Sequence, residues 1–441
     1  MKKILSINKK IESFNKSIDV QGDKSLSIRW VLISSLSKKK SIAYNLLKSE
    51  DVLSALECIK VLGSKVKLSK DKCEIIGVGL NPKIKNKTTF NAGNSGTLGR
   101  LILGLLVNSK SKIKLIGDKS LSQRDFSRVV QPLEKFGAKF NSKKTLPLEM
   151  KGLDKPKAIN YLEKKGSAQC KTTVMFAALK SKGETIIKAK KSRDHTELIF
   201  KYLKLPIKIK KKENYDIIKI KEVKKVNSLN YKIPGDISSC AFFIVLTVLS
   251  KKSELLIRNI NINPSRIGII TILKKMGASI HFKNQKIYKG EQIADIFVKS
   301  SKKLKSINCP IKYNSSAIDE FLIIFLVAAK AKGISHFKDI SELNQKESPR
   351  LNLGSKILNM MGIKTILTKD SIKIYGQPKL KIKKKIIIKN FLKDHRIFMM
   401  STIAALTLGG QWTIHDSDSI KTSFPSFIKT LERIGKIRKC F

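Results

Sequence analysis

The residues best suited to chemistry on anions occur in short segments rich in glycine, serine and arginine. The first runs from Gly22 to Arg29 (GDKSLSIR), and the second runs from Asn91 to Arg100 (NAGNSGTLGR). Glycine lets a ligand approach the backbone closely, and N–H groups, hydroxyls and cations together bind anions. The spacing of the second segment matches neither the Walker A nor the dinucleotide pattern. Both segments predict anion binding, although each could also be a helix cap with solvated charges.

Three further segments in the first half of the chain have the same character. They are Gly117 to Arg124 (GDKSLSQR), Gly166 to Gln169 (GSAQ) and Ser192 to Glu197 (SRDHTE). The GSAQ segment opens a predicted helix, and the donors at a helix N-terminus suit a phosphate group. A single histidine such as His195 is more often structural than catalytic.

The second half of the chain carries acidic residues beside cations. Its polar segments are Ile318 to Glu320 (IDE), Lys346 to Arg350 (KESPR), Asp394 to Arg396 (DHR) and Lys421 to Pro425 (KTSFP). Each could be a solvated cap, but together the segments of both halves predict one cleft lined with cations and holding two separated acids. That combination fits proton transfer on a substrate with several negative charges.

A repeat along the chain predicts the elements that position these segments. Short amphipathic stretches end in an apolar residue and a glycine, followed by an alternating strand-like run. Six copies are centred on Gly63, Gly137, Pro206, Gly277, Gly362 and Gly435, where Pro206 marks a degenerate copy. Near-even spacing predicts six α/β units, three in each of two similar halves.

The limits of the two halves follow from two Gly-Asp turns. They lie in VQGDKS, which begins at Val20, and in IPGD, which ends at Asp236. We interpret them as neighbouring crossovers. The predicted domains are therefore residues 20–237, and residues 1–19 together with 238–441.

Composition excludes several other classes of protein. The net charge is +56, but only 11 of the 90 basic residues are arginine, and the lysines are scattered rather than gathered into one arm. Lysine, isoleucine and asparagine have AT-rich codons, so we expect no nucleic-acid partner. The longest apolar runs, Cys240 to Leu249 and Phe321 to Ala329, are far shorter than the roughly 20 residues of a membrane helix. We expect no membrane association and no signal peptide.

The six cysteines give no sign of a metal site or of disulfides. None forms a CxxC pair, and none has metal-ligand spacing with histidine. In a chain of this length they are most simply thiols in a reducing compartment. The sequence therefore predicts a cytoplasmic protein with no metal and no catalytic cysteine.

Taken together, the motifs resemble those of the EPSP synthase family of enolpyruvyltransferases. The similar segments are GDKSLSIR, GNSGTLGR, GDKSLSQR, GSAQ, SRDHTE, PGDISS, NPSRIG, IDE, KESPR, DHRIFM and SFP, and they occur in family order over nearly the whole chain. The resemblance implies an α/β fold of two similar domains, each with three βαβαββ units around a pseudo-threefold axis (an inverse α/β barrel). The SAQ and SRDHTE forms resemble a bacterial subclass that includes glyphosate-tolerant members.

The resemblance also implies a reaction and a set of site residues. The enolpyruvyl group of phosphoenolpyruvate would move to the 5-hydroxyl of shikimate 3-phosphate by addition and elimination, without a cofactor. The catalytic residues would be Lys24, Asp319 and Glu347. The residues implied for shikimate 3-phosphate are Lys24, Ser25, Arg29, Ser167, Ala168, Gln169, Arg193, Asp319 and Lys346. The residues implied for phosphoenolpyruvate are Lys24, Asn94, Gly96, Arg124, Gln169, Arg350, Arg396 and Lys421.

The chain departs from the family pattern around one of the predicted acids. Pro349 stands where members usually have Asp, and Asn344 and Gln345 stand where Arg-Val or Arg-Tyr is usual. Pro349 removes a backbone donor and restricts Ser348, so the placement of Glu347 and Arg350 is in question. The alternatives are a UDP-N-acetylglucosamine enolpyruvyltransferase, a basic nucleic-acid-binding protein and an inactive scaffold paralogue. We expect a monomer whose partners are the two anionic substrates.

Overall fold

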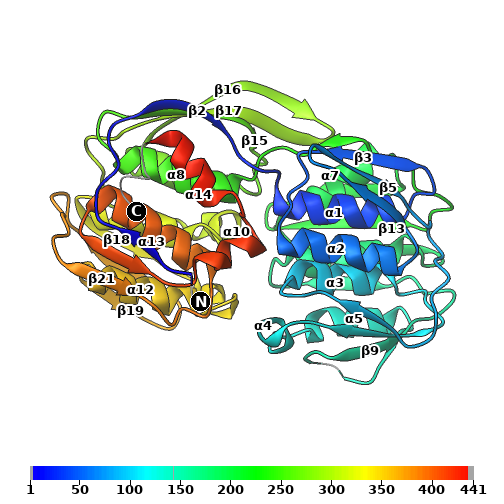
Figure 1. The fold of residues 1–441 in the computed structure, drawn as a ribbon. Helices are drawn as coiled ribbons and strands as arrows, with labels where there is room; N and C mark the ends of the chain where they lie inside the picture. The colour runs from blue at the N-terminus through cyan, green and yellow to red at the C-terminus, as the bar shows by residue number, and fades with distance from the viewer. Residues whose placement is uncertain (1–2, 143, 436–441) are drawn as a thin grey trace. The chain divides into compact units, whose positions relative to one another are not determined.

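The computed structural model describes residues 3–142 and 144–435 (Figure 1). The chain divides into two compact units. Unit 2 comprises residues 22–233 and the short segment Tyr288–Glu291. Unit 1 comprises the described residues up to Gln21, residues 234–287, and those from Gln292 onward.

Unit 2 repeats the order strand, helix, strand, helix and two antiparallel strands. One complete copy consists of β6 (Thr88–Asn91), α3 (Gly96–Leu105), β7 (Lys112–Ile116), α5 (Ser127–Lys135), β8 (Lys139–Phe140) and β9 (Leu148–Lys151). Another consists of β10 (Asn160–Glu163), α6 (Ala168–Ala178), β11 (Glu184–Lys190), α7 (His195–Tyr202), β12 (Ile207–Lys211) and β13 (Tyr215–Lys221). The first pair of strands in each copy is parallel and the remaining pairs are antiparallel. A short helix, α4 (Lys119–Ser122), lies between β7 and α5.

The remaining copy in unit 2 takes its first strand from the far end of the unit. It consists of α1 (Lys24–Ser35), β3 (Lys40–Tyr44), α2 (Glu50–Val61), β4 (Lys65–Leu68) and β5 (Lys72–Ile76). Strand β14 (Tyr231–Lys232) pairs in parallel with β3 and completes the sheet.

Unit 1 follows the same plan with two remote strands. Its first copy consists of α8 (Ile237–Leu249), β15 (Glu254–Asn261), α9 (Gly268–Lys275), β16 (Ser279–Tyr288) and β17 (Glu291–Lys299). Strand β2 (Asn15–Asp19) joins β15 in parallel. Strand β1 (Leu5–Ile7) joins β22 antiparallel in another sheet. Both strands that precede residue 20 therefore belong to sheets of unit 1.

The other two copies in unit 1 contain most of the acidic segments. One consists of α11 (Phe321–Lys330), β18 (Gly333–Phe337), α12 (Arg350–Met360), β19 (Thr365–Leu367) and β20 (Ile372–Gly376), with α10 (Asn314–Ala317) before them. The other consists of β21 (Lys385–Ile388), α13 (His395–Leu408), β22 (Gln411–Ile414) and α14 (Phe427–Ile434). Three short 3-10 turns are η1 (Ile311–Tyr313), η2 (Ser341–Gln345) and η3 (Ser417–Thr422).

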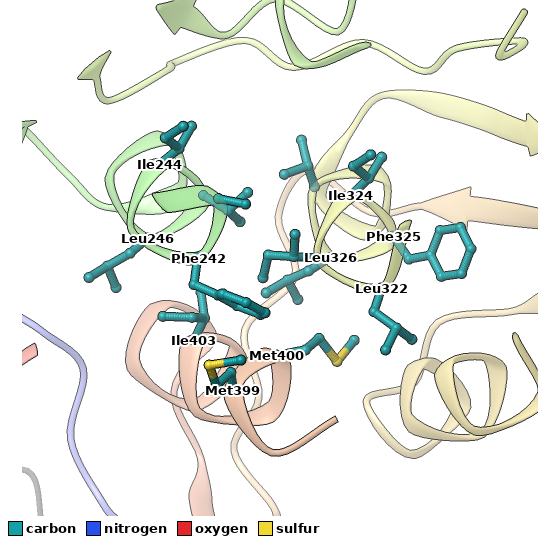
Figure 2. Packing of buried hydrophobic residues seen from close by; sticks show 14 of the residues in the cluster. Phe242, Ile244, Leu246, Leu322, Ile324, Phe325, Leu326, Met399, Met400 and Ile403 are labelled. Carbon is teal, nitrogen blue, oxygen red and sulfur yellow. The ribbon is translucent and has the colours of Figure 1, made fainter. Parts of the chain in front are cut away.

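Each unit is built around helices that are buried on all sides. In unit 1 these are α8, α11 and α13, whose side chains pack together, with Phe242, Leu326 and Met400 among them (Figure 2). Twelve of the thirteen residues of α8 are buried. A helix that is apolar around its whole circumference must be covered by other elements. In unit 2, α1, α3 and α6 have the same buried character.

The predicted helix, glycine and strand order is present at the repeats. Gly63, Gly137, Gly277 and Gly362 follow helices and have φ between +86° and +104°. In the degenerate copy Lys204 adopts the left-handed conformation, with φ +55°, ahead of Pro206. The strand predicted after Gly435 lies outside the described residues.

Candidate active site

Three of the five predicted anion-binding segments of unit 2 lie at the N-termini of its buried helices. Lys24 begins α1, Gly96 begins α3 and Ala168 begins α6. In unit 1, Asp319 precedes α11 by two residues and Asp394 caps α13. Because the first N–H groups of a helix lack intrahelical partners and carry partial positive charge, these ends suit anions.

Lys24 is held at the start of α1 by an acid from the next helix. Its Nζ lies 3.0 Å from Oδ2 of Asp51, whose side chain is buried. Asp23 caps α1 by accepting a hydrogen bond from the N–H of Leu26 at 2.8 Å. The predicted turn and helix start are therefore present, and the ion pair fixes the direction of Lys24.

Arg29 lies one turn further along α1 and is buried in a hydroxyl network. Its Nε donates to Oγ1 of Thr196 at 2.9 Å, and its Nη2 donates to Oγ1 of Thr172 at 3.3 Å. Its Nη1 donates to the carbonyl of Ser25 at 3.0 Å. Arg29 therefore joins α1 to α6 and α7.

Asn94 and Arg124 are in direct contact. Nη2 of Arg124 donates to Oδ1 of Asn94 at 3.0 Å, and Nδ2 of Asn94 donates to Oδ2 of Asp118 at 2.6 Å. The two residues come from different motifs but lie beside Gly96. A Cβ added at Gly96 would lie 3.2 Å from Nη1 of Arg124.

The GSAQ segment is fixed by residues from two other segments. Oε1 of Gln169 accepts from Nη1 of Arg100 at 2.9 Å, while its Nε2 donates to Oγ1 of Thr97 at 2.9 Å. Glu163, which is buried, accepts from the N–H of Ser167 at 2.9 Å and from Nη2 of Arg128 at 2.8 Å. The orientation of Gln169 is therefore set by protein groups on both ends of its amide.

Two further predicted cations, one in each unit, lie close to the start of a helix. Arg193 is half-buried in the loop between β11 and α7, two residues before α7 begins. Lys421 is exposed on η3, and the neighbouring Thr422 lies 3.4 Å from Nδ1 of His395, the first residue of α13. Lys421 is therefore near the helix end that carries Arg396, whereas Arg193 lies beside the start of α7.

Arg350 is the centre of the acidic cluster in unit 1. Its Nη2 donates to Oε2 of Glu347 at 2.5 Å, and its Nε donates to Oδ2 of Asp394 at 2.8 Å. Its Nη1 lies 3.7 Å from Oδ1 of Asp319. One buried guanidinium thus faces three carboxylates that come from three different loops.

Asp319 is approached by two further cations. Nζ of Lys346 lies 3.6 Å from Oδ1 of Asp319, and Nη1 of Arg396 donates to its backbone carbonyl at 2.6 Å. Nη1 of Arg396 also lies 3.6 Å from Oε1 of Glu320. The structure therefore brings Asp319, Lys346, Glu347, Arg350 and Arg396 into one connected cluster.

The electrostatics of this cluster keep its central groups charged. Burial disfavours the charged form of Arg350, but Asp394 and Glu347 outweigh it and raise the pKa of the guanidinium. Burial also opposes ionisation of Asp394, yet Arg350 and His395 hold the pKa of that carboxyl below its usual value. A fixed positive charge beside separated carboxylates suits the binding of an anionic substrate next to proton-transfer groups.

The five described cysteines are not suited to nucleophilic catalysis. All are buried, and burial raises the pKa of Cys58 and Cys73 to about 12 and that of Cys309 to about 11. The thiolate is the reactive form. Among the described residues no group of three or more His, Cys, Asp and Glu side chains is arranged to hold a metal ion. None of the helices in that part of the chain is both long and apolar enough to cross a membrane.

Several residues that contact predicted site residues were missed when the site was predicted from sequence, among them Arg100, Asp394, Asp51 and Glu163. Arg100 and Asp394 stand inside quoted motifs, and their charge was the available signal. Asp51 and Glu163 lie in segments without a polar motif, so nothing local marked them. Each is a buried or half-buried charged group that fixes a predicted residue.

Comparison with known proteins supports the interpretation of the motifs. The family model for EPSP synthase (3-phosphoshikimate 1-carboxyvinyltransferase) matches residues 8–431. The chain is 39% identical over 429 residues to the 3-phosphoshikimate 1-carboxyvinyltransferase of Ruthia magnifica, covering 97% of each chain. It is 36% identical over 431 residues to the enzyme of that name from Petrotoga mobilis, covering 97% of this chain and 98% of the relative.

Solved structures give the same result for the fold. The EPSP synthase of Acinetobacter baumannii matches with a TM-score of 0.86 and 33% identity, over 99% of this chain and 98% of that one. The enolpyruvyl transferase NikO of Streptomyces tendae matches with a TM-score of 0.75 over 98% of each chain, but at 11% identity it supports the fold alone. The predicted fold class and the predicted enzyme class are confirmed. With matching motifs, fold and full-length relatives, this chain belongs to the EPSP synthase family of enolpyruvyltransferases.

Proposed function

We propose that this chain transfers the enolpyruvyl group of phosphoenolpyruvate to the 5-hydroxyl of shikimate 3-phosphate and releases phosphate. Membership of the family supports the reaction. The observation that carries the assignment of residues is the cluster around Arg350, in which Glu347 and Asp319 flank a guanidinium of fixed charge.

The proposed assignment gives each substrate a set of residues, and Lys24 and Gln169 belong to both sets. Shikimate 3-phosphate is held by Lys24, Ser25, Arg29, Ser167, Ala168, Gln169, Arg193, Asp319 and Lys346. Phosphoenolpyruvate is held by Lys24, Asn94, Gly96, Arg124, Gln169, Arg350, Arg396 and Lys421. Guanidinium groups suit this task because they bind carboxylate and phosphate oxygens in pairs.

The addition step needs one proton acceptor and one proton donor. The 5-hydroxyl oxygen attacks C2 of phosphoenolpyruvate, and Asp319 takes the hydroxyl proton. Glu347 gives a proton to C3, so this methylene carbon becomes a methyl group, the C2–C3 bond becomes single, and C2 is the centre of a tetrahedral adduct. Lys346, 3.6 Å from Asp319, then faces both the base and the shikimate hydroxyl.

The elimination step restores the double bond. The bond from C2 to the phosphate oxygen breaks, and one proton of the methyl group returns to Glu347. Lys24 and the surrounding arginines stabilise the leaving phosphate, because cations fixed in advance cost no reorganisation when charge develops. The departing phosphate takes up one proton, and loss of the hydroxyl proton from Asp319 restores the base. No redox change occurs, and the atoms of both substrates then appear in the two products.

We also propose the wider setting of the enzyme. The two halves are residues 20–237, and residues 1–19 with 238–441, each an enolpyruvyltransferase half, and the protein works as a cytoplasmic monomer without nucleic acid. Free, buried thiols fit a reducing compartment. Light scattering of the purified chain tests the monomer, and a salt titration with duplex DNA tests the last point.

A coupled phosphate-release assay tests the proposed reaction directly. Phosphate should appear only when both phosphoenolpyruvate and shikimate 3-phosphate are present, and mass spectrometry should detect the enolpyruvyl ether product. Phosphate release from phosphoenolpyruvate alone, or no release with both substrates, would contradict the proposal.

A further inference from the structure

We infer that Asn344 is a positioning residue that caps helix α12 from a distance and thereby fixes Glu347 and Arg350; this rests on the proposed function for its catalytic consequence. Helix α12 begins at Arg350, directly after Pro349. Proline has no side-chain acceptor, and no side-chain hydrogen bond from Pro349 caps the helix. The cap must therefore come from another part of the chain.

Asn344 supplies the missing acceptor. Its Oδ1 accepts from the N–H of Leu351 at 3.0 Å and from the N–H of Asn352 at 3.3 Å. Its Nδ2 donates to Oδ1 of Asn352 at 3.1 Å, which fixes the orientation of the amide. These two N–H groups are the ones that a cap residue at position 349 would normally satisfy.

The remaining N–H groups of the first turn are also satisfied. The N–H of Arg350 donates to the carbonyl of Ser348 at 2.8 Å, and that of Leu353 donates to the carbonyl of Pro349 at 2.9 Å. All four N–H groups of the first turn therefore have hydrogen-bond partners, and Asn344 supplies the partner for two of them. Loss of the Asn344 oxygen would leave two donors at the end of α12 without their partner.

This cap matters because Arg350 is the first residue of α12. Its guanidinium reaches Glu347 at 2.5 Å and Asp394 at 2.8 Å, and its side chain is 2% exposed. The contact from Asn344 to Leu351 closes a loop that carries Lys346 and Glu347. Ser348 adds a second attachment by donating to Oδ2 of Asp394 at 2.8 Å.

Asn344 and Pro349 are therefore coupled. If Asn344 replaces the cap that Pro349 cannot give, an acceptor placed at position 349 should make Asn344 dispensable. Aspartate is among the best cap residues, and Pro349 has φ −71°, which an aspartate also adopts readily. The two positions should then show a strong interaction in a double-mutant cycle.

The experiment compares Asn344→Ala, Asn344→Asp, Pro349→Asp and the double variant Asn344→Ala/Pro349→Asp in the full chain. The matched control is Asn359→Ala, which removes an acceptor for Thr365 near the other end of α12. Hydrogen exchange of the Leu351 and Asn352 amides measures the cap itself, and steady-state kinetics measure its effect on turnover.

We expect Asn344→Ala to speed exchange at Leu351 and Asn352 by about fivefold or more, as local opening becomes easier. We expect kcat to fall about tenfold, because small misplacements of catalytic groups are costly, while the KM for shikimate 3-phosphate changes by less than about twofold. Asn344→Asp and the double variant should return close to the native values. Asn359→Ala should change neither measurement.

Wild-type exchange and turnover in Asn344→Ala would overturn the inference. So would a loss that Pro349→Asp does not repair, because Asn344 would then act by another route. If Asn344→Ala fails to fold, recovery of a folded protein in the double variant supports the cap, and failure of both overturns it. If the wild type shows no transferase activity, the proposed function is wrong. The hydrogen-exchange measurement still tests whether Asn344 caps α12, because it does not depend on activity.

Discussion

Nη2 of Arg350 lies 2.5 Å from Oε2 of Glu347, three residues earlier in the chain and just before α12 begins. This contact ties a proposed proton donor to the guanidinium that also holds Asp394. Arg350, which we propose binds the anionic substrate, therefore contacts the proposed proton donor directly. A change of either residue should lower kcat.

Replacing Glu347 with glutamine should lower kcat by roughly 10²-fold or more, the usual contribution of general acid–base help. The substituted amide keeps the size of the side chain, so substrate binding should be largely retained. Asp319→Asn should behave likewise. Glu342→Gln is the control, since Glu342 is a half-exposed acid that lies 3.9 Å from Lys346. Near-native turnover in either site variant would remove that residue from its assigned role.

Arg124→Lys should raise the KM for phosphoenolpyruvate by about tenfold or more, although the charge is kept. Arg124 holds Asn94 through Nη2, and a lysine offers no planar pair of donors for an anion. Arg258→Lys is the control, because Arg258 forms a paired contact with the carboxylate of Asp19 at an exposed site. Equal Michaelis constants for wild type and Arg124→Lys would place Arg124 outside the substrate site.

Gly96→Ala should relieve inhibition by glyphosate, which we expect to compete with phosphoenolpyruvate in the native enzyme. The added Cβ would lie 2.9 Å from Nη1 of Arg100 and 3.2 Å from Nη1 of Arg124. Both atoms end flexible side chains, so the fold should survive while the pocket narrows. Overpacking costs about 1–3 kcal/mol, which corresponds to a roughly tenfold to hundredfold loss of binding affinity. Glyphosate is longer than phosphoenolpyruvate, so its affinity should be reduced most.

The control for this steric argument is Gly99→Ala in the same helix. There the added Cβ would meet the ring of Phe126 at 3.3 Å rather than an arginine. We expect the inhibition constant of Gly99→Ala to match the native value. Identical inhibition constants for the native enzyme and a folded Gly96→Ala variant would contradict the proposed pocket.

Lys180 should make the free energy of unfolding depend on pH. It is buried, its Nζ donates to Oδ1 of Asn108 at 3.0 Å and to the carbonyl of Leu105, and burial lowers its pKa to about 7. The unfolded chain, with the ordinary pKa of 10.5, binds more protons between these values, so stability should rise with pH across that window.

Denaturation of wild type and Lys180→Met at pH values from about 6.5 to about 10 checks this prediction. The other titrating groups are shared, so the difference between the two free energies of unfolding isolates Lys180. The free energy of unfolding of the wild type should increase relative to that of Lys180→Met as pH rises. A difference that stays constant across the range would show that Lys180 is charged in the folded state.

Patterns along the sequence were sufficient for the features that depend on near neighbours. The helix, glycine and strand repeat identified the α/β units, since the stop of a helix and the alternation of a strand are local properties. The start of α1 after Asp23 and the start of α6 after Ser167 were readable from their polar caps. The motif order also identified the family, because the quoted segments extend over nearly the whole chain.

Only the tertiary structure decided which distant groups meet. Asp394 is 44 residues from Arg350, and Glu163 is 35 residues from Arg128, so no local spacing encodes these contacts. The sequence also did not predict how the chain compensates for Pro349. Asn344 supplies the acceptor that Pro349 lacks, and its position depends on the packing of the loop that carries it. Local sequence sets propensities within a few residues, whereas burial and pairing depend on how each unit folds around its own buried helices, which in unit 1 are α8, α11 and α13.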